Sequence, residues 1–243
     1  RAAIGLRTKL GESLASVQSY FKKFDEVATA SLEALKAYTA GRREWEHGDM
    51  GAKRHQLRAI EIDPEFASAY SALAIACNNM GQTIEAKRYM QRAYELRHRM
   101  SERERIRTDA NYHDAVTGDA YLAIEALRAW QGSAYAESNA FGNCCSVQMQ
   151  LGQWEKALAN ALRGWQMEPS AIFAGNLTII HLALGQADAA RGTLEDAFAR
   201  GWDAFYLHLQ AYQEAFLRDD REAMRRHVEA VAGREGEEDF LIA

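Results

Sequence analysis

The feature that most constrains this chain is a repeated pair of small residues. Glycine followed five residues later by alanine recurs at a regular spacing, beginning at Gly81, Gly118, Gly152 and Gly185. Two weaker copies flank them: Gly48 precedes Ala52 by four residues, and Arg218 stands five residues before Ala223, where glycine is expected. The six alanines, at positions 52, 86, 123, 157, 190 and 223, are 33 to 37 residues apart. Such a period is typical of a solenoid of repeated supersecondary units.

Each unit is predicted to contain two amphipathic helices separated by its glycine. Before the glycine, apolar or small residues recur at spacings of 4, 3 and 4, as in Ala69, Leu73, Ala76 and Met80 and in Phe173, Leu177, Ile180 and Leu184. This spacing places them on one helical face. Beyond the glycine, residues 85–96 and 155–167 are rich in helix formers, and Pro64 and Pro169 follow second helices. Helices this short are marginal alone, so neighbouring hairpins must bury each other's faces.

A helix-turn-helix unit of about 34 residues with these glycine, alanine and proline marks resembles the tetratricopeptide repeat, or TPR. Six units are expected at about 31–65, 66–98, 101–135, 136–169, 170–202 and 203–232, followed by a truncated C-terminal segment. The end units match loosely, as capping repeats do. The resemblance implies an all-α, right-handed superhelical solenoid with an extra N-terminal helix.

Residues 1–30 differ from the repeats and are predicted to form an N-terminal helix and linker, with Leu6, Leu10, Leu14 and Val17 on one face. The strings at 6–18, 31–38, 101–105 and 236–239 resemble the C-terminal TPR region of bacterial, acidobacterial-type serine/threonine kinase or regulator proteins. The first residue is Arg1 rather than methionine, which we interpret as a fragment with the remnant of an upstream domain. The resemblance implies the docking or sensor half of a larger signalling protein.

Composition limits the function classes. There are 29 basic and 34 acidic residues, which gives a formal charge of -5. A chain with this mild acidity offers no basic surface for the phosphates of a nucleic acid, so nucleic acid is not expected as a partner. No apolar stretch is long enough for a membrane span, so direct membrane insertion is not expected. A cytoplasmic location is favoured, with an extracytoplasmic one open if the parent protein has a membrane span upstream.

Motifs for catalysis are absent from the sequence. It contains no glycine-rich phosphate loop, no HRD or DFG motif, no HExxH and no CxxC. We therefore expect no enzyme activity in this chain, no cofactor and no metal site, and any kinase activity would lie in the parent protein. Cys77, Cys144 and Cys145 are predicted to be buried packing residues rather than redox or metal groups.

Two further local features carry predictions. Residues 97–107 hold five arginines and coincide with the longest spacing between repeats. We interpret them as an inter-repeat turn with a capping box between Ser101 and Glu104, and the alternative is an anion or partner site.

Trp130 and Gly164 occupy one repeat position in neighbouring units. We expect the Trp130 ring to fill the space that alanine usually closes, and Gly164 to relieve crowding beside it.

The resemblance implies that a partner binds the concave surface lined by the first helix of each unit. The corresponding residues are Tyr38, Arg42, Trp45, Ser71, Ile75, Asn78, Asn79, Arg105, Thr108, Asp109, Tyr112, Asn139, Asn143, Ser146, Gln150, Asn176, Ile179, His208 and Tyr212. Asn143 and Asn176 share one repeat position, and an amide can both donate to and accept from a peptide backbone. The cations that hold a terminal carboxylate in chaperone-type TPR clamps are missing, because Gly142, Ser146, Gly175 and Ile179 stand there.

We expect a non-catalytic scaffold that binds a protein or peptide segment in this groove. One alternative is a small-molecule sensor with its ligand in the groove, which a closed apolar pocket with converging polar groups would favour. Another is an oligomerisation module that forms a homodimer through the terminal units. The asparagines could also merely solvate an exposed helix face.

Overall fold

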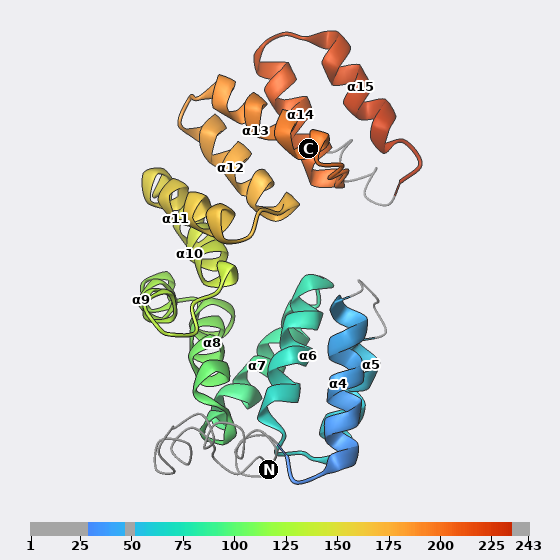
Figure 1. The fold of residues 1–243 in the computed structure, drawn as a ribbon, viewed down its shortest axis with the longest axis vertical. Helices are drawn as coiled ribbons and strands as arrows, with labels where there is room; N and C mark the ends of the chain where they lie inside the picture. The colour runs from blue at the N-terminus through green and yellow to red at the C-terminus, as the bar shows by residue number, and fades with distance from the viewer. Residues whose placement is uncertain (1–28, 47–51, 235–243) are drawn as a thin grey trace, which may run out of the picture. The chain divides into compact units, whose positions relative to one another are not determined.

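The structure is a computed structural model that describes residues 29–46 and 52–234 (Figure 1). The predicted helix at residues 1–30 therefore lies almost entirely outside the described residues. Every regular element within these two ranges is a helix. The chain divides into two compact units, Arg1–Asp119 and Ala120–Ala243. The division falls inside the predicted third repeat, so that its two helices belong to different units.

The first unit contains two helical hairpins and one further helix. α4 (Leu32–Glu46) packs against α5 (Ala52–Ile62), and α6 (Ala67–Asn79) packs against α7 (Thr83–Glu95). A short 3-10 turn, η1 (Arg97–Arg99), leads into α8 (Glu102–Tyr112), which continues directly as a π-helical turn, η2 (His113–Thr117). Successive hairpins stack because α5 packs on α6 and α7 packs on α8.

The second unit repeats this pattern. α9 (Ala120–Gln131) packs on α10 (Ser138–Gln150), which forms a hairpin with α11 (Trp154–Met167). α12 (Ala171–Ala183) pairs with α13 (Ala187–Ala199), and α14 (Phe205–Leu217) pairs with α15 (Arg221–Val231). α10, α12 and α14 each have 13 residues and are the first helices of their hairpins.

The turns between the two helices of each repeat confirm the role predicted for glycine. Gly81, Gly118, Gly152 and Gly185 all have φ between 65° and 70°, a left-handed conformation that costs glycine least. In the last hairpin the equivalent residue is Asp219, at φ 55°, rather than Arg218. The last repeat is thus displaced by one residue from the expected register. In α15, Ala223 is buried as expected, whereas at the second seam position Val231 is buried and Ala230 is exposed.

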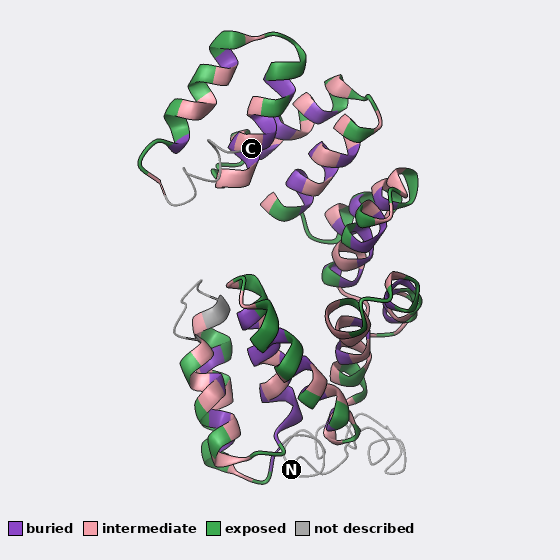
Figure 2. Cartoon of the chain, turned by 180° about the vertical axis from the view of Figure 1, so that it is seen from behind, coloured by how far each residue is buried: buried purple, intermediate pink, exposed green. Residues whose placement is uncertain are grey.

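The cores are narrow seams between paired helices. Ala59, Ala93, Ala157 and Ala197 are fully buried, and Figure 2 shows one buried stripe along most helices with exposed residues on the other side. Small side chains on these stripes allow close approach of helix backbones. Larger buried residues such as Leu73 and Ile180 fill the space between successive hairpins. The amphipathic spacing seen in the sequence therefore corresponds to real buried faces.

The long spacing before Gly118 is absorbed in the first helix of that repeat. α8 has 11 residues and η2 adds 5, whereas α6, α10, α12 and α14 have 13. The extra residues therefore extend this helix as a π-helical turn instead of forming a longer loop. Ser101 caps α8, and the capping box with Glu104 is present as predicted.

Candidate functional site

The second unit presents one open stripe from each of its first helices. Helix positions 2, 6, 9 and 13 lie on one face of a helix, because their spacings of 4, 3 and 4 match the helical period. We call these twelve residues the α10–α12–α14 face. They are Asn139, Asn143, Ser146 and Gln150 on α10, Ile172, Asn176, Ile179 and Ala183 on α12, and Tyr206, Gln210, Gln213 and Leu217 on α14. All except Gln210 are half-buried or exposed.

The sixth position of each helix carries an amide. Asn143 and Asn176 hold it on α10 and α12, as the sequence predicted, and Gln210 holds it on α14. The sequence analysis did not assign Gln210 to this position, because the last repeat is displaced by one residue. A count of 34 residues from Asn176, rather than 33, leads directly to it. The structure therefore places three amides at equivalent points of three successive first helices.

Glycines allow these first helices to lie close together, because they have no side chain between the helices. A Cβ atom added to Gly142 on α10 would lie 3.4 Å from the ring of Phe173 on α12. A Cβ atom added to Gly175 on α12 would lie 3.0 Å from the ring of Tyr206 on α14. Each glycine thus accepts an aromatic ring from the next first helix. This packing sets the spacing between rows of the face.

His208 is not part of the α10–α12–α14 face. It is 7% exposed and lies between α14 and α15, where its Nδ1 atom is 3.0 Å from Nδ1 of His227. Its Nε2 atom bonds Asp203, and the Phe198 ring packs on both imidazoles. Burial, together with the neighbouring His208, lowers the pKa of His227. Tyr212 is at the eighth position of α14 and is half-buried.

In the first unit, several predicted groove residues are engaged within the fold. Ser71 on α6 and Thr108 on α8 are both buried, and their hydroxyl oxygens are 3.3 Å apart. They join neighbouring first helices and leave no surface for a ligand. Arg42, Asn78 and Asn79 are exposed. The side chain of Trp45 lies outside the described residues.

Asp109 and Tyr112 belong to a second cluster in the first unit. The Tyr112 ring stacks on Tyr94 of α7 at 3.7 Å between centroids, and the Arg97 guanidinium lies over the other side of Tyr94, also at 3.7 Å. Arg97 Nε is 3.2 Å from Asp109 Oδ1, although burial still raises the pKa of Asp109. Arg97 and Arg99, which pairs with Glu65, therefore form structural contacts. This supports an inter-repeat turn over an anion site for these two arginines.

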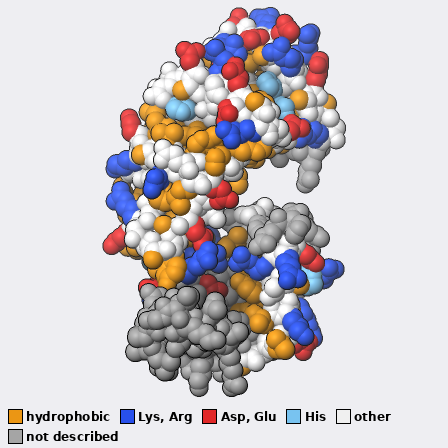
Figure 3. Space-filling view, viewed as in Figure 1, with side chains coloured by type: hydrophobic (Ala, Val, Ile, Leu, Met, Phe, Trp, Pro, Cys, Tyr) orange, Lys and Arg blue, Asp and Glu red, His pale blue; other side chains and the backbone are white. Residues whose placement is uncertain are grey.

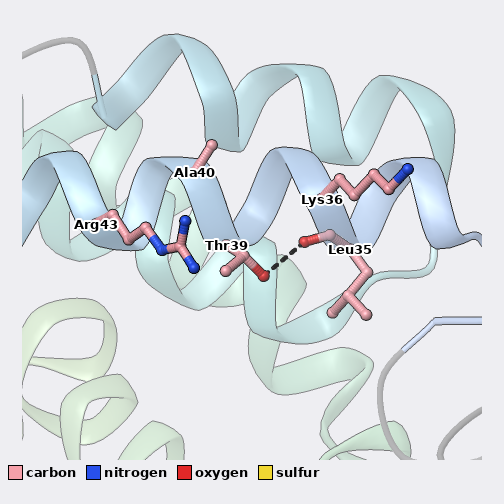
Figure 4. Close-up of a pocket in the computed structure, with 5 residues that line it drawn as sticks. All are labelled: Leu35, Lys36, Thr39, Ala40 and Arg43. Atoms are coloured by element: carbon pink, nitrogen blue, oxygen red, sulfur yellow. Dashed lines mark hydrogen bonds between the residues drawn. The ribbon is translucent and has the colours of Figure 1, made fainter.

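A shallow pocket lies on α4 in the first unit (Figure 4). It is lined by Leu35, Lys36, Thr39, Ala40 and Arg43, which all come from this one helix. Thr39 donates its hydroxyl hydrogen to the carbonyl of Leu35 at 2.8 Å. A pocket with side chains from a single helix is open rather than enclosed, so it does not supply the closed apolar site that a small-molecule sensor requires.

The cysteines and tryptophan behave largely as the sequence predicted. Cys77, Cys144 and Cys145 are fully buried, and burial raises the pKa of each thiol, to about 12 for Cys145. Trp130 is 1% exposed and donates its indole hydrogen to the Tyr135 carbonyl at 3.0 Å. The expectation for Gly164 was wrong. The ring that lies against it is Phe173, not Trp130.

Residues 29–46 and 52–234 contain no group of three His, Cys, Asp or Glu side chains that could hold a metal ion. Within the same ranges, no helix has the length and hydropathy needed to cross a bilayer.

The geometry defines a protein of stacked helical hairpins with an open face of first helices. Comparison with known families agrees, because residues 55–88 match the model described as tetratricopeptide repeat. This segment runs from His55 in α5 through the whole of α6 to Arg88 in α7, which is one repeat length. No curated protein sequence matches the chain.

Solved structures share the fold at low sequence identity. A chain of the APC/C hetero-tetramer Cut9-Hcn1 has a TM-score of 0.66 and 16% identity, with 86% of this chain and 42% of that chain covered. PilW, a type IV pilus biogenesis factor, has a TM-score of 0.65 and 14% identity over 87% of this chain and 100% of its own. The human IFIT1 dimer with m7Gppp-AAAA has a TM-score of 0.71 and 14% identity over 97% and 59%. This chain thus spans less than two thirds of the length of the Cut9-Hcn1 and IFIT1 chains.

These likenesses establish the fold. Together with the all-helical described residues, they confirm the expected class, an all-α solenoid of the TPR type. The family match supports a TPR protein, a type that is generally a non-catalytic scaffold for protein–protein interaction.

Proposed function

We propose that this chain is a scaffold that binds a segment of a partner protein along the α10–α12–α14 face. The observation that carries the proposal is the row of amides, Asn143, Asn176 and Gln210, at one position of three successive first helices. Each amide can donate to a carbonyl and accept from an N–H of a peptide backbone. A row of amides therefore suits an extended segment of varied sequence.

The geometry of helix packing matches an extended ligand. Neighbouring helix axes are about 8–10 Å apart, and an extended chain advances about 3.3 Å per residue. One step from α10 to α12, or from α12 to α14, thus corresponds to about three residues of ligand. Backbone groups of a segment crossing the face would then meet the amides at regular intervals.

A displayed library of random short peptides tests the proposal. Selected peptides are titrated against the full chain and against the double variant Asn143→Ala with Asn176→Ala. If each amide contributes about 1 kcal/mol, the double variant weakens binding about tenfold or more. Gln91→Ala with Gln166→Ala on second helices serves as a control and should leave the affinity unchanged. Equal affinity for all three proteins would refute the groove assignment.

We also propose that this docking unit serves a larger bacterial signalling protein with a serine/threonine kinase or regulator domain. That step is supported only by the resemblance of residues 6–18, 31–38, 101–105 and 236–239. Its test is the reading frame that encodes the parent protein. An uninterrupted frame with no kinase or regulator domain would rule it out.

A further inference from the structure

Charge is segregated between the two kinds of helix in the second unit. In α10, α12 and α14 the sole Asp, Glu, Lys or Arg residue is Glu214. Glu214 is 3% exposed and is held by Arg191 and Arg218, so its charge is not displayed. The second helices α11, α13 and α15 carry many exposed charges, including Glu155, Lys156 and Arg225.

The same face displays apolar side chains. Ile172 is 64% exposed and Leu217 is 65% exposed, and Phe216 beside Leu217 is 64% exposed. In Figure 3, hydrophobic side chains gather over the α12 region of the second unit, while charged side chains lie toward its outer parts. Ile172 lies in the first turn of α12 and Leu217 is the last residue of α14, so exposed apolar groups lie toward both ends of a face that displays no charge. Apolar exposure on such a face favours a binding surface over a solvated one.

One buried amide oxygen on this face lacks a hydrogen-bond partner among the described residues. Gln210 is 6% exposed, and its Oε1 atom accepts no hydrogen bond from any described residue. Its Nε2 atom reaches toward α12, where it would lie 3.3 Å from a Cβ atom on Gly175. A buried acceptor without a donor costs free energy. If the Gln210 side chain rotated so that Oε1 accepted a hydrogen bond from an N–H of the ligand, that cost would be removed.

These observations decide what a ligand can be. A charged group laid on the face would lose hydration and find no displayed opposite charge, which disfavours a carboxylate, a phosphate or a basic peptide. Apolar side chains would gain from contact with Ile172 and Leu217, and backbone amides would meet the amide row. A nucleic acid would lack the Lys and Arg contacts that its backbone needs.

We infer that the partner is an uncharged, apolar segment of another protein, bound through its backbone by Asn143, Asn176 and Gln210 and through its apolar side chains by Ile172 and Leu217. This inference rests on the proposed function of the face. It adds the chemistry of the ligand and assigns Gln210 as a third amide contact.

The test uses peptides selected from the random library on the full chain. Enriched sequences should have few charged residues, and their affinity should change less than about threefold between about 0.05 and 0.5 M NaCl, since screening acts only on charges. Replacing an uncharged residue of a selected peptide by Lys or Glu should lower the affinity of the peptide for the chain about tenfold. Ser146→Glu, which places a charge on the face, should weaken the neutral peptide similarly, whereas Gln166→Glu on α11 should not.

Gln210→Leu separates binding from stability. Because leucine removes the unpartnered oxygen, we expect the midpoint of unfolding to rise while peptide affinity falls about threefold or more. Unchanged peptide affinity in this variant would remove Gln210 from the site.

Three outcomes would overturn the inference. Selected peptides that are strongly acidic or basic, lose affinity with salt and still depend on Asn143 and Asn176 would leave the proposed function standing and refute the neutral partner. Concentration-dependent dimers abolished by Ser146→Glu would make a second copy the occupant. If no peptide distinguishes the chain from the Asn143→Ala, Asn176→Ala variant, the proposed function itself fails.

Discussion

The ring of Phe173 occupies the space that a side chain at Gly164 would need. A Cβ atom on Gly164 would lie 2.2 Å from two carbons of that ring, and both residues are buried. Phe173 begins the buried stripe of α12, and Gly164 lies near the end of α11. The pair therefore sets how closely the two hairpins approach.

Gly164→Ala should destabilise the second unit by about 1–3 kcal/mol. The methyl group must displace the Phe173 ring from a filled core, and this cost exceeds the roughly 1 kcal/mol that alanine gains over glycine in a helix. The midpoint of urea unfolding, followed by circular dichroism, measures the change.

Gly192→Ala is the matched control, because Gly192 lies inside α13 and nothing comes within 4 Å of a Cβ atom placed on it. Here only the helix preference acts, so stability should rise by about 0.5–1 kcal/mol. Equal shifts for the two variants would contradict the packing argument.

Glu214→Ala should cost about 2–3 kcal/mol of stability. Glu214 is nearly fully buried and accepts hydrogen bonds from Arg218 at 2.7 and 3.0 Å and from Arg191 at 3.1 Å. Hydrogen bonds to charged groups of this kind contribute more than neutral ones. The exposed pair of Glu222 and Arg226 gives the comparison, since Glu222→Ala should change stability by less than about 0.5 kcal/mol. Similar unfolding midpoints for the two variants would refute the assignment.

The α14–α15 hairpin should lose stability in mild acid. Burial, His208 and Arg226 lower the pKa of His227, opposed by the weaker effect of Glu214, so the unfolded chain binds a proton more readily than the folded one. Stability is then fully present above the ordinary histidine pKa of about 6.5 and falls as the pH drops below it.

The readout is the difference in melting temperature between about pH 7.5 and pH 5.5. His227→Gln should reduce this difference, while His98→Gln, at an exposed residue in η1, should leave it unchanged. The pKa of Asp203 is lowered by His208 and Arg234, and it contributes mainly at lower pH. An identical pH dependence in all three proteins would exclude His227 as the source.

Cys145 should resist alkylation in the folded chain. Its burial, with a smaller effect of Cys144, raises its pKa to about 12, and the reactive species is the thiolate. Brief treatment with iodoacetamide near pH 8 should leave it unmodified by mass spectrometry and modify it fully after denaturation. Rapid labelling of the native chain would show that this part of α10 opens readily.

Much of the candidate site could be predicted because it depends on local periodicity. Asn139, Asn143, Ser146 and Asn176 lie on the face where the repeat pattern placed them. His208 and Gln210 could not be placed correctly, because the last repeat has no glycine to mark its turn. Asp219 takes the left-handed conformation instead, and a one-residue displacement turns each side chain about 100° around the helix.

The sequence by itself determined the helical hairpins, the glycine turns, the alanine seams and the burial of the cysteines, since each follows from helix period and backbone conformation over a few residues. Tertiary structure decided the partner of Gly164, the burial of His208 beside His227, and the row that Gln210 completes. These depend on which side chain of one helix enters the space left by the next. That choice is made by packing between residues far apart along the chain, where local preference has no influence.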